Sequence, residues 1–388
     1  MKRILACTSI RSDYDLMSPL YKMLNDDSEI DLKVLVSGAH LSIHHGHTVD
    51  QIHADGLDIL IKIETLLSSD SQISRIKSAS ILLQSCIETI YQYNPDLIIY
   101  AGDREDVLVY AMVGGYLGIP TIHFYSGDHV SDGYIDNPVR HATSKLSTAH
   151  FVTLEQHKTR LMRMGEMESR ISVVGNIALD RFVSFQPLSL EEISLRLGRE
   201  EVKNDFALVI FHPITSEVPI ADVIFENILR SLEEQNIVGI VSYPNVDYGN
   251  QKIVSVIEKY KDNPNFIFYK NLTRNLFLSI YKRSKFIIGN SSSGICEAAS
   301  VPIPAINVGI RQLGRYADSN VVFCDSSYSS IKQAVQEVCE ESFTSKLHNL
   351  CNSYGKGNGA ERAFQIIKNT DFKPLVAKYE DPLDGEST

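Results

Sequence analysis

The chain has 388 residues, of which 44% are hydrophobic and 22% are charged, so its composition predicts folded globular domains and its length predicts two of them. The formal net charge of −11, with no basic block, argues against nucleic acid or an anionic membrane as a main partner. Six scattered cysteines without paired spacing favour reduced thiols over a disulfide framework or a zinc site. No apolar run is long enough to span a bilayer and no cleavable signal is recognisable, so we expect a cytoplasmic protein with no membrane contact.

Short apolar runs alternate with amphipathic stretches through the first half of the chain. The runs that read as buried strands are residues 3–9, 32–38, 96–102, 119–125, 149–153 and 171–176. Helical patterns lie between them, among them residues 15–25 and 107–118. Residues 138–147 predict a further helix, with Pro138 near its first turn.

The second half of the chain repeats this alternation. Its predicted strands are residues 206–213, 237–245, 265–270, 285–292 and 303–309, with a helix at residues 251–261. Strands that alternate with helices predict parallel sheets with helices on both faces. The predicted fold class is therefore α/β, with two Rossmann-like, doubly wound domains facing a cleft.

The domain boundary is expected near residues 178–190, where the strand pattern stops and Pro187 occurs. Residues 1–180 then form an N-terminal domain with the sugar-binding and catalytic loops, and residues 181–372 form a nucleotide-binding domain. Residues 373–388 are predicted to be an exposed tail. Ligands of doubly wound domains bind at the carboxyl ends of the strands, so the functional residues should follow the strands.

Polar clusters follow six of the predicted strands at that same end. They read TSIRSDY, SGAHLSIHHGH, AGDRED and YSGDH in the first half, and FHP and GNSSSGICE in the second. One such cluster is typical of any loop, because loops carry polar residues. Six clusters on matching strand ends indicate a binding cleft instead.

Residues 289–300 read as a strand end, a loop of small residues and the start of a helix. This pattern suits a bound phosphate, and it equally suits an ordinary helix with a serine cap. Glu297 can accept hydrogen bonds from a ribose or can be a simple first-turn acid. The arginines that can clamp a diphosphate with forked hydrogen bonds are Arg311, Arg315 and, in the first domain, Arg11.

Carboxylates and histidines concentrate after the third and fourth predicted strands. Asp103 ends a strand in Gly-Asp, so it can aim a carboxylate into the cleft, or it can cap the next helix. Further candidates for acid–base chemistry or ligand contact are Asp128, Asp136, Arg140, His141 and, after the second strand, His40. No His-x-x-x-His pair is joined by a carboxylate, so no metal site is expected.

Taken with AGDRED, FHP and INVGIRQLGR, the block IDNPVRHATSKLS makes the motifs recognisable as a set. The chain resembles the hydrolysing UDP-N-acetylglucosamine 2-epimerases of bacterial sialic-acid biosynthesis, which have a glycosyltransferase-B-like fold. The resemblance implies that UDP leaves by anti elimination to a 2-acetamidoglucal, and that water then adds to give N-acetylmannosamine. It also implies a homodimer and no cofactor.

The resemblance carries roles over to matching positions. Asp103 and Asp136 match acidic catalytic residues, and His212 matches a histidine near the diphosphate. The residues implied to hold the phosphates and the ribose are Arg11, Asn290, Ser291, Ser292, Ser293, Gly294, Arg315 and Glu297. Those implied to line the cleft are His40, Arg104, Tyr125, Arg140, His141 and Arg311.

The sequence departs from the family at the end of the fourth predicted strand. The family reads His-x-Glu-Gly-Gly-Glu there, whereas this chain reads HFYSGD, with Tyr125 at the position of a catalytic glutamate and Ser126 in place of a glycine. One further residue is inserted before Asp136. Three explanations compete: Asp128 is the replacement base, the substrate is a modified sugar, or hydrolysis is impaired; we favour the first two together.

The sequence therefore predicts a hydrolysing 2-epimerase of a nucleotide sugar linked to UDP or GDP. The sugar is N-acetylglucosamine or a 2,4-diacetamido-trideoxyhexose, as in legionaminic-acid pathways. The alternatives are a non-hydrolysing 2-epimerase, a retaining glycosyltransferase, and a nucleotide-sugar-binding protein without turnover.

Overall fold

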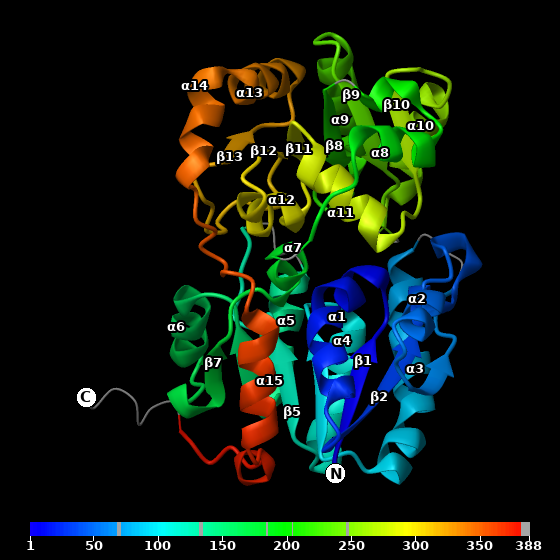
Figure 1. The fold of residues 1–388 in the computed structure, drawn as a ribbon. Helices are drawn as coiled ribbons and strands as arrows, with labels where there is room; N and C mark the ends of the chain where they lie inside the picture. The colour runs from blue at the N-terminus through cyan, green and yellow to red at the C-terminus, as the bar shows by residue number, and fades with distance from the viewer. Residues whose placement is uncertain (68–70, 132–134, 184, 204, 246–247, 382–388) are drawn as a thin grey trace. The chain divides into compact units, whose positions relative to one another are not determined.

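The computed structural model describes residues 1–67, 71–131, 135–183, 185–203, 205–245 and 248–381 (Figure 1). These residues divide into two compact units. The first unit contains the chain up to His129, then residues 135–183 and the segment from Tyr354 onward. The second unit contains the residues from 185 to 353 together with Val130 and Ser131.

The first unit is built on a seven-stranded parallel sheet with the order β3-β2-β1-β4-β5-β6-β7. Its strands are β1 Lys2–Thr8, β2 Ile30–Ser37, β3 Ile59–Ile63, β4 Leu97–Ala101, β5 Thr121–Phe124, β6 Ala149–Val152 and β7 Ile171–Val173. Its α-helices are α1 Arg11–Asp26, α2 Val49–Ala54, α3 Gln72–Tyr93, α4 Glu105–Leu117, α5 Asp136–Leu146, α6 Glu155–Arg163, α7 Asp180–Val183 and α15 Gly359–Asn369. The strand order reverses at β1 and β4, which is the switch point where doubly wound sheets bind ligands.

The second unit is built on a six-stranded parallel sheet with the order β10-β9-β8-β11-β12-β13. Its strands are β8 Phe206–Ile210, β9 Val238–Ser242, β10 Phe266–Tyr269, β11 Phe286–Gly289, β12 Ala305–Val308 and β13 Val321–Cys324. Its α-helices are α8 Leu190–Leu197, α9 Ala221–Glu233, α10 Asn250–Tyr260, α11 Arg274–Arg283, α12 Ser292–Cys296, α13 Tyr328–Cys339 and α14 Glu341–Thr344. The prediction of two doubly wound α/β domains is confirmed, with the switch point of this unit at β8 and β11.

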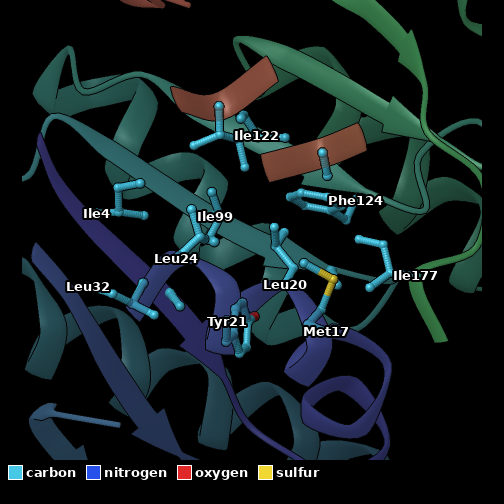
Figure 2. Packing of buried hydrophobic residues seen from close by; sticks show 14 of the residues in the cluster. Ile4, Met17, Leu20, Tyr21, Leu24, Leu32, Ile99, Ile122, Phe124 and Ile177 are labelled. Atoms are coloured by element: carbon cyan, nitrogen blue, oxygen red, sulfur yellow. The ribbon is translucent and has the colours of Figure 1, made fainter. Parts of the chain in front are cut away.

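Alternate residues of the central strands face opposite sides of the first sheet. Ile4 and Ile99 face α1, where Figure 2 shows Met17, Leu20, Tyr21 and Leu24 packed against them. The neighbouring strand residues Leu5, Cys7 and Ile98 face the other side of the sheet. There they form a second core with Leu82 of α3 and Tyr110 of α4. Both faces of the central strands are therefore buried, which explains their continuous apolar runs.

Two strands that the sequence did not predict, β3 and β13, lie at the edges of their sheets. β3 is only partly buried along most of its length, and β13 is half-exposed. Their apolar runs, ILIKI and VVFC, are short, and a short apolar run cannot be told from a buried helix segment by periodicity alone.

The C-terminal segment differs from the expectation that residues up to 372 belong to the second domain and that residues 373–388 form an exposed tail. The helix α15 packs against α1, and Ala360, Ala363, Ile367 and Phe372 join the core of the first unit. The described residues 373–381 also bond to this unit. An amphipathic pattern reveals the helix but does not reveal which sheet it covers.

All six cysteines are free, as the absence of paired spacing predicts. Among the described residues, none of the helices has the length and hydropathy of a membrane span.

Gly289, at the end of β11, has a positive φ of 141°, and a Cβ there would lie 2.0 Å from the backbone oxygen of Ile210. We expect Gly289→Ala to lower the free energy of unfolding of the protein by more than about 3 kcal/mol. The added Cβ forces the backbone at Ile210 to move, and alanine is also strained at this positive φ. Gly198→Ala is the control, since that position has a positive φ but open space, and it should cost about 1 kcal/mol. Equal urea midpoints for the two variants would contradict this account.

Candidate active site

The ends of β4 and α5 meet in an ion pair between Asp103 and Arg140. Gly102 has a φ of 102°, which turns the chain sharply after β4 and places Asp103 at the strand end. The Arg140 guanidinium is 3% exposed and donates a hydrogen bond to the Asp103 carboxylate, which is 29% exposed. The same guanidinium donates to the backbone oxygen of Asp128, at 3.2 Å. One buried cation therefore connects the loops after β4 and β5 with α5.

His123, on β5, bonds to both the loop after β4 and the helix α5. Its Nε2 lies 2.7 Å from the backbone oxygen of Gly102, and its Nδ1 lies 3.0 Å from Oγ of Ser144 on α5. Burial lowers the pKa of His123 to about 3, so the ring is neutral. Nε2–H then donates to Gly102, and Nδ1 accepts from the Ser144 hydroxyl. The sequence analysis did not select His123; its only signal is a polar side chain inside a buried strand.

Asp128 lies against α6. One carboxylate oxygen accepts the backbone N–H of His129 at 2.8 Å and lies 3.4 Å from Nε2 of His157. The side chain is 15% exposed, and Arg160 binds the backbone oxygen of the preceding residue, Gly127. Arg140 therefore contacts the backbone of Asp128 as well as the carboxylate of Asp103. The basic residues His157 and Arg160 of α6 lie on the other side of Asp128.

Tyr125 has a φ of 60°, which is uncommon for a residue with a side chain. Its hydroxyl donates a hydrogen bond to Oδ1 of Asn176, at 3.1 Å, and its ring packs against the core shown in Figure 2. The phenol that occupies the position of the family's glutamate is thus partly committed to Asn176.

His129 and His141 stack beside Arg140, with ring centroids 5.7 Å apart and planes 13° apart. Burial, with Arg140 as a further cause, lowers the pKa of His141 to about 4, and burial also lowers the pKa of His129. Asp136 is half-buried and is the first residue of α5. The helix therefore starts two residues before Pro138, where the sequence predicted its start.

Three other predicted residues of the first unit serve the local fold. Arg11 begins α1 and pairs with Asp15 at 3.2 Å, and Arg104 is the N-cap residue of α4. His40 was predicted to contact a ligand, but it is fully buried. Its ring nitrogens bond to Thr8 and Thr48, so its geometry fits a structural role instead.

In the second unit, Asn290 connects two strand ends. Its amide accepts the backbone N–H of His212 at 2.8 Å and donates to the backbone oxygen of His212 at 2.7 Å. Asn290 was predicted to hold a phosphate, but its side chain is fully buried and occupied by this pairing. His212 Nδ1 accepts the backbone N–H of Asn245, which leaves the proton on Nε2.

Arg311 and Arg315 gather at the same place. Arg311 donates to the backbone oxygen of Asn290 at 3.2 Å, and so does the buried amide of Gln312 at 2.9 Å. Gln312 Oε1 then accepts a hydrogen bond from Arg315 at 2.7 Å. Gln312 was missed by the sequence analysis because an amide between two arginines carries no distinctive signal.

The serine loop begins α12. Ser291 is its N-cap and accepts the backbone N–H of Ser293 at 3.3 Å, while Oγ of Ser293 donates to Tyr281. Ser292 is exposed, Gly294 is buried, and Glu297 is 4% exposed at the end of the helix. With five residues, α12 has a weaker dipole than the sequence suggested, so hydroxyl and arginine groups must supply most of any anion binding.

Comparison with known proteins places this geometry in context. The UDP-N-acetylglucosamine 2-epimerase family matches residues 22–368. The UDP-N,N'-diacetylbacillosamine 2-epimerase (hydrolyzing) of Legionella pneumophila is 34% identical over 95% of this chain and 96% of that protein. The UDP-N-acetylglucosamine 2-epimerase of Neisseria meningitidis is 30% identical over 96% of each chain. A crystal structure of the Methanocaldococcus jannaschii UDP-GlcNAc 2-epimerase with UDP-GlcNAc and UDP covers 95% of this chain, with a TM-score of 0.78 and 19% identity.

The fold is thus of the glycosyltransferase-B-like class, with two Rossmann-like domains. Within that class, the chain belongs to the UDP-N-acetylglucosamine 2-epimerase family.

The neutral, buried His123 makes stability depend on pH. The pKa is about 6.5 for an unperturbed histidine and about 3 in the fold, so this stabilisation is complete above pH 6.5 and is lost as pH falls towards 3. Between pH 6.5 and 5, we expect the wild type to lose up to about 2 kcal/mol of unfolding free energy that His123→Gln does not lose. Ser144→Ala removes a partner but keeps the ring, so it should retain the wild-type slope in urea titrations. The same slope in His123→Gln would exclude His123 as the origin.

Proposed function

We propose that this protein is a hydrolysing nucleotide-sugar 2-epimerase, which converts a UDP-linked 2-acetamido sugar to the free manno-configured sugar and UDP. The observation that carries this proposal is the Asp103–Arg140 pair, held at the switch point of the first sheet by the neutral His123. The names of the Legionella pneumophila and Campylobacter jejuni relatives both specify hydrolysis, which supports the same reading.

The chemistry needs a base in the first step. The base removes the proton on carbon 2, and the electron pair of that carbon–hydrogen bond forms the carbon 1–carbon 2 double bond of a glycal. UDP leaves with the electron pair of the broken carbon 1–oxygen bond. A guanidinium at hydrogen-bond distance favours a charged carboxylate, and the exposed part of Asp103 can accept the proton. Water then adds its oxygen to carbon 1, and a proton returns to carbon 2 from the opposite face.

We assign diphosphate binding to the second unit. Arg311 and Arg315 supply forked donors, and Nε2–H of His212 supplies another. Ser292 can add a hydroxyl donor, whereas Asn290 and Gln312 hold the arginines and the backbone in place. Glu297 is assigned to the ribose by the family resemblance.

For the sugar, we propose the 2,4-diacetamido-trideoxy relative of UDP-N-acetylglucosamine as the preferred substrate. The support is the altered loop at Tyr125 and the 34% identity to a protein named for UDP-N,N'-diacetylbacillosamine. The Campylobacter jejuni relative is named for both GDP- and UDP-linked forms, so the nucleotide is part of the test. A place in legionaminic-acid or sialic-acid synthesis would follow from the product.

The test is proton NMR of the protein in D2O with UDP-N-acetylglucosamine, UDP-N,N'-diacetylbacillosamine or the GDP-linked form of the latter. We expect free UDP and a manno-configured sugar with deuterium at carbon 2. Asp103→Asn should reduce turnover at least about 100-fold, because an amide does not accept the proton, while UDP affinity stays within about two-fold.

Each alternative gives a different spectrum. A nucleotide-linked manno sugar without free UDP would replace this proposal with the non-hydrolysing reaction. The names of the Neisseria meningitidis and Methanocaldococcus jannaschii relatives do not specify hydrolysis. Retention of configuration at carbon 2 with sugar transfer to an acceptor would indicate a glycosyltransferase. Binding of UDP without any turnover would indicate a binding protein.

A second variant tests the role of Asp128. If Asp128 replaces the family's glutamate, Asp128→Asn should lower kcat about 100-fold with little change in UDP affinity. Glu155→Gln is the matched control, because it removes an exposed negative charge from the first turn of α6, the helix that also carries His157. Wild-type kcat in Asp128→Asn would show that this carboxylate is not the missing base.

A further inference from the structure

A C-terminal strap, defined here as residues 373–381, binds the first unit through Arg170. The Arg170 guanidinium is almost fully buried and contacts both carboxylate oxygens of Glu380. It also donates to the backbone oxygens of Leu375 and Ala377. One arginine thus binds the strap at three of its residues, which indicates a defined position rather than a loose tail.

The strap also supplies a cation to a buried carboxylate. Glu166 has a fully buried side chain, and its oxygens lie 2.7 Å from Nζ of Lys378, 2.7 Å from Nζ of Lys145 and 2.8 Å from Nε2 of His150. Burial alone would raise the pKa of Glu166, but the bonds from His150 and the two lysines outweigh it and lower the pKa to about 2. Glu166 is therefore a stable anion to which Lys378 attaches the strap.

The same ammonium group of Lys378 contacts the last turn of α5. It donates to the backbone oxygen of Lys145 at 3.0 Å and to that of Ser144 at 3.4 Å. These carbonyls belong to the C-terminal end of the helix, where a cation is favourable both as a hydrogen-bond donor and against the helix dipole.

Polar contacts continue from this point to Asp103. Ser144, whose carbonyl Lys378 contacts, bonds through its hydroxyl to His123, and His123 donates to Gly102 beside Asp103. Arg140, the partner of Asp103, lies one turn earlier on α5, and its carbonyl oxygen is 3.0 Å from Oγ of Ser144. The strap therefore contacts the one helix whose position sets the Asp103–Arg140 geometry.

We infer that Lys378 is a positioning residue: it connects Glu166 to the end of α5 and thereby holds Arg140 and Asp103 in their reactive geometry. The inference rests on the proposed function for its effect on rate. It assigns the C-terminal segment a role in the chemistry of the first unit, although Lys378 touches no reacting atom.

The test compares Lys378→Met with Lys378→Arg and Lys373→Met. Lys378→Met removes the cation and keeps the stem, Lys378→Arg restores a cation, and Lys373→Met makes the same change in the same strap where the lysine pairs with Asp96 instead. We expect Lys378→Met to lower kcat about 10-fold with KM within about two-fold, because the substrate still binds while the base is displaced. Lys378→Arg and Lys373→Met should stay within about two-fold of the wild type.

A second measurement does not depend on turnover. In amide hydrogen exchange followed by mass spectrometry, Lys378→Met should exchange the α5 peptide about five-fold faster, with β1 and β4 unchanged. Unchanged α5 exchange, or an unchanged kcat in an active enzyme, would overturn the inference. A wild type that turns over no nucleotide sugar would refute the proposed function, and the exchange result alone would then decide whether the strap positions α5.

Discussion

The buried guanidinium of Arg140 is the interaction on which the first unit's candidate site depends. A cation in so protected a place is tolerated only if its charge and its N–H groups find partners. Its partners are the Asp103 carboxylate and a backbone oxygen of the next loop, so satisfying the cation also aligns two strand ends with one helix. His123 contacts the loop after β4 from β5 and remains uncharged, because burial lowers its pKa.

The second unit aligns its strand ends with the buried side-chain amides of Asn290 and Gln312. The Asn290 side chain accepts from the backbone N–H of His212 and donates to its backbone oxygen. The Gln312 side chain in turn accepts a hydrogen bond from Arg315. Amides suit this role because each carries a donor and an acceptor, and burial then requires no counter-ion. The groups proposed to bind the diphosphate can therefore remain at the loop surface, while the backbone beneath them is held by hydrogen bonds.

The sequence was sufficient for the α/β class and for most central strands, because their apolar runs and the alternation with helices follow directly from burial on both faces. It was also sufficient to locate the polar strand ends, including Asp103 and the His212 region. It did not separate ligand-facing residues from supporting ones: His40 and Asn290 look like site residues by position, yet their side chains bond within the fold. That distinction depends on side-chain direction and partners distant in sequence, which a single sequence does not specify. The placement of α15 failed for the same reason, since its apolar face fits either sheet.

The return of residues from Tyr354 onward to the first unit has a consequence for the order of folding during synthesis. The sheet of the first unit has all its strands by Val173, but one face of its core lacks Ala363 and Ile367 until α15 emerges from the ribosome. The second unit has all its strands by Cys324 and does not wait for α15. Although domains usually fold in order from the N-terminus, here the N-terminal unit is the later one to complete its core, and one of its apolar faces stays partly uncovered in the interval.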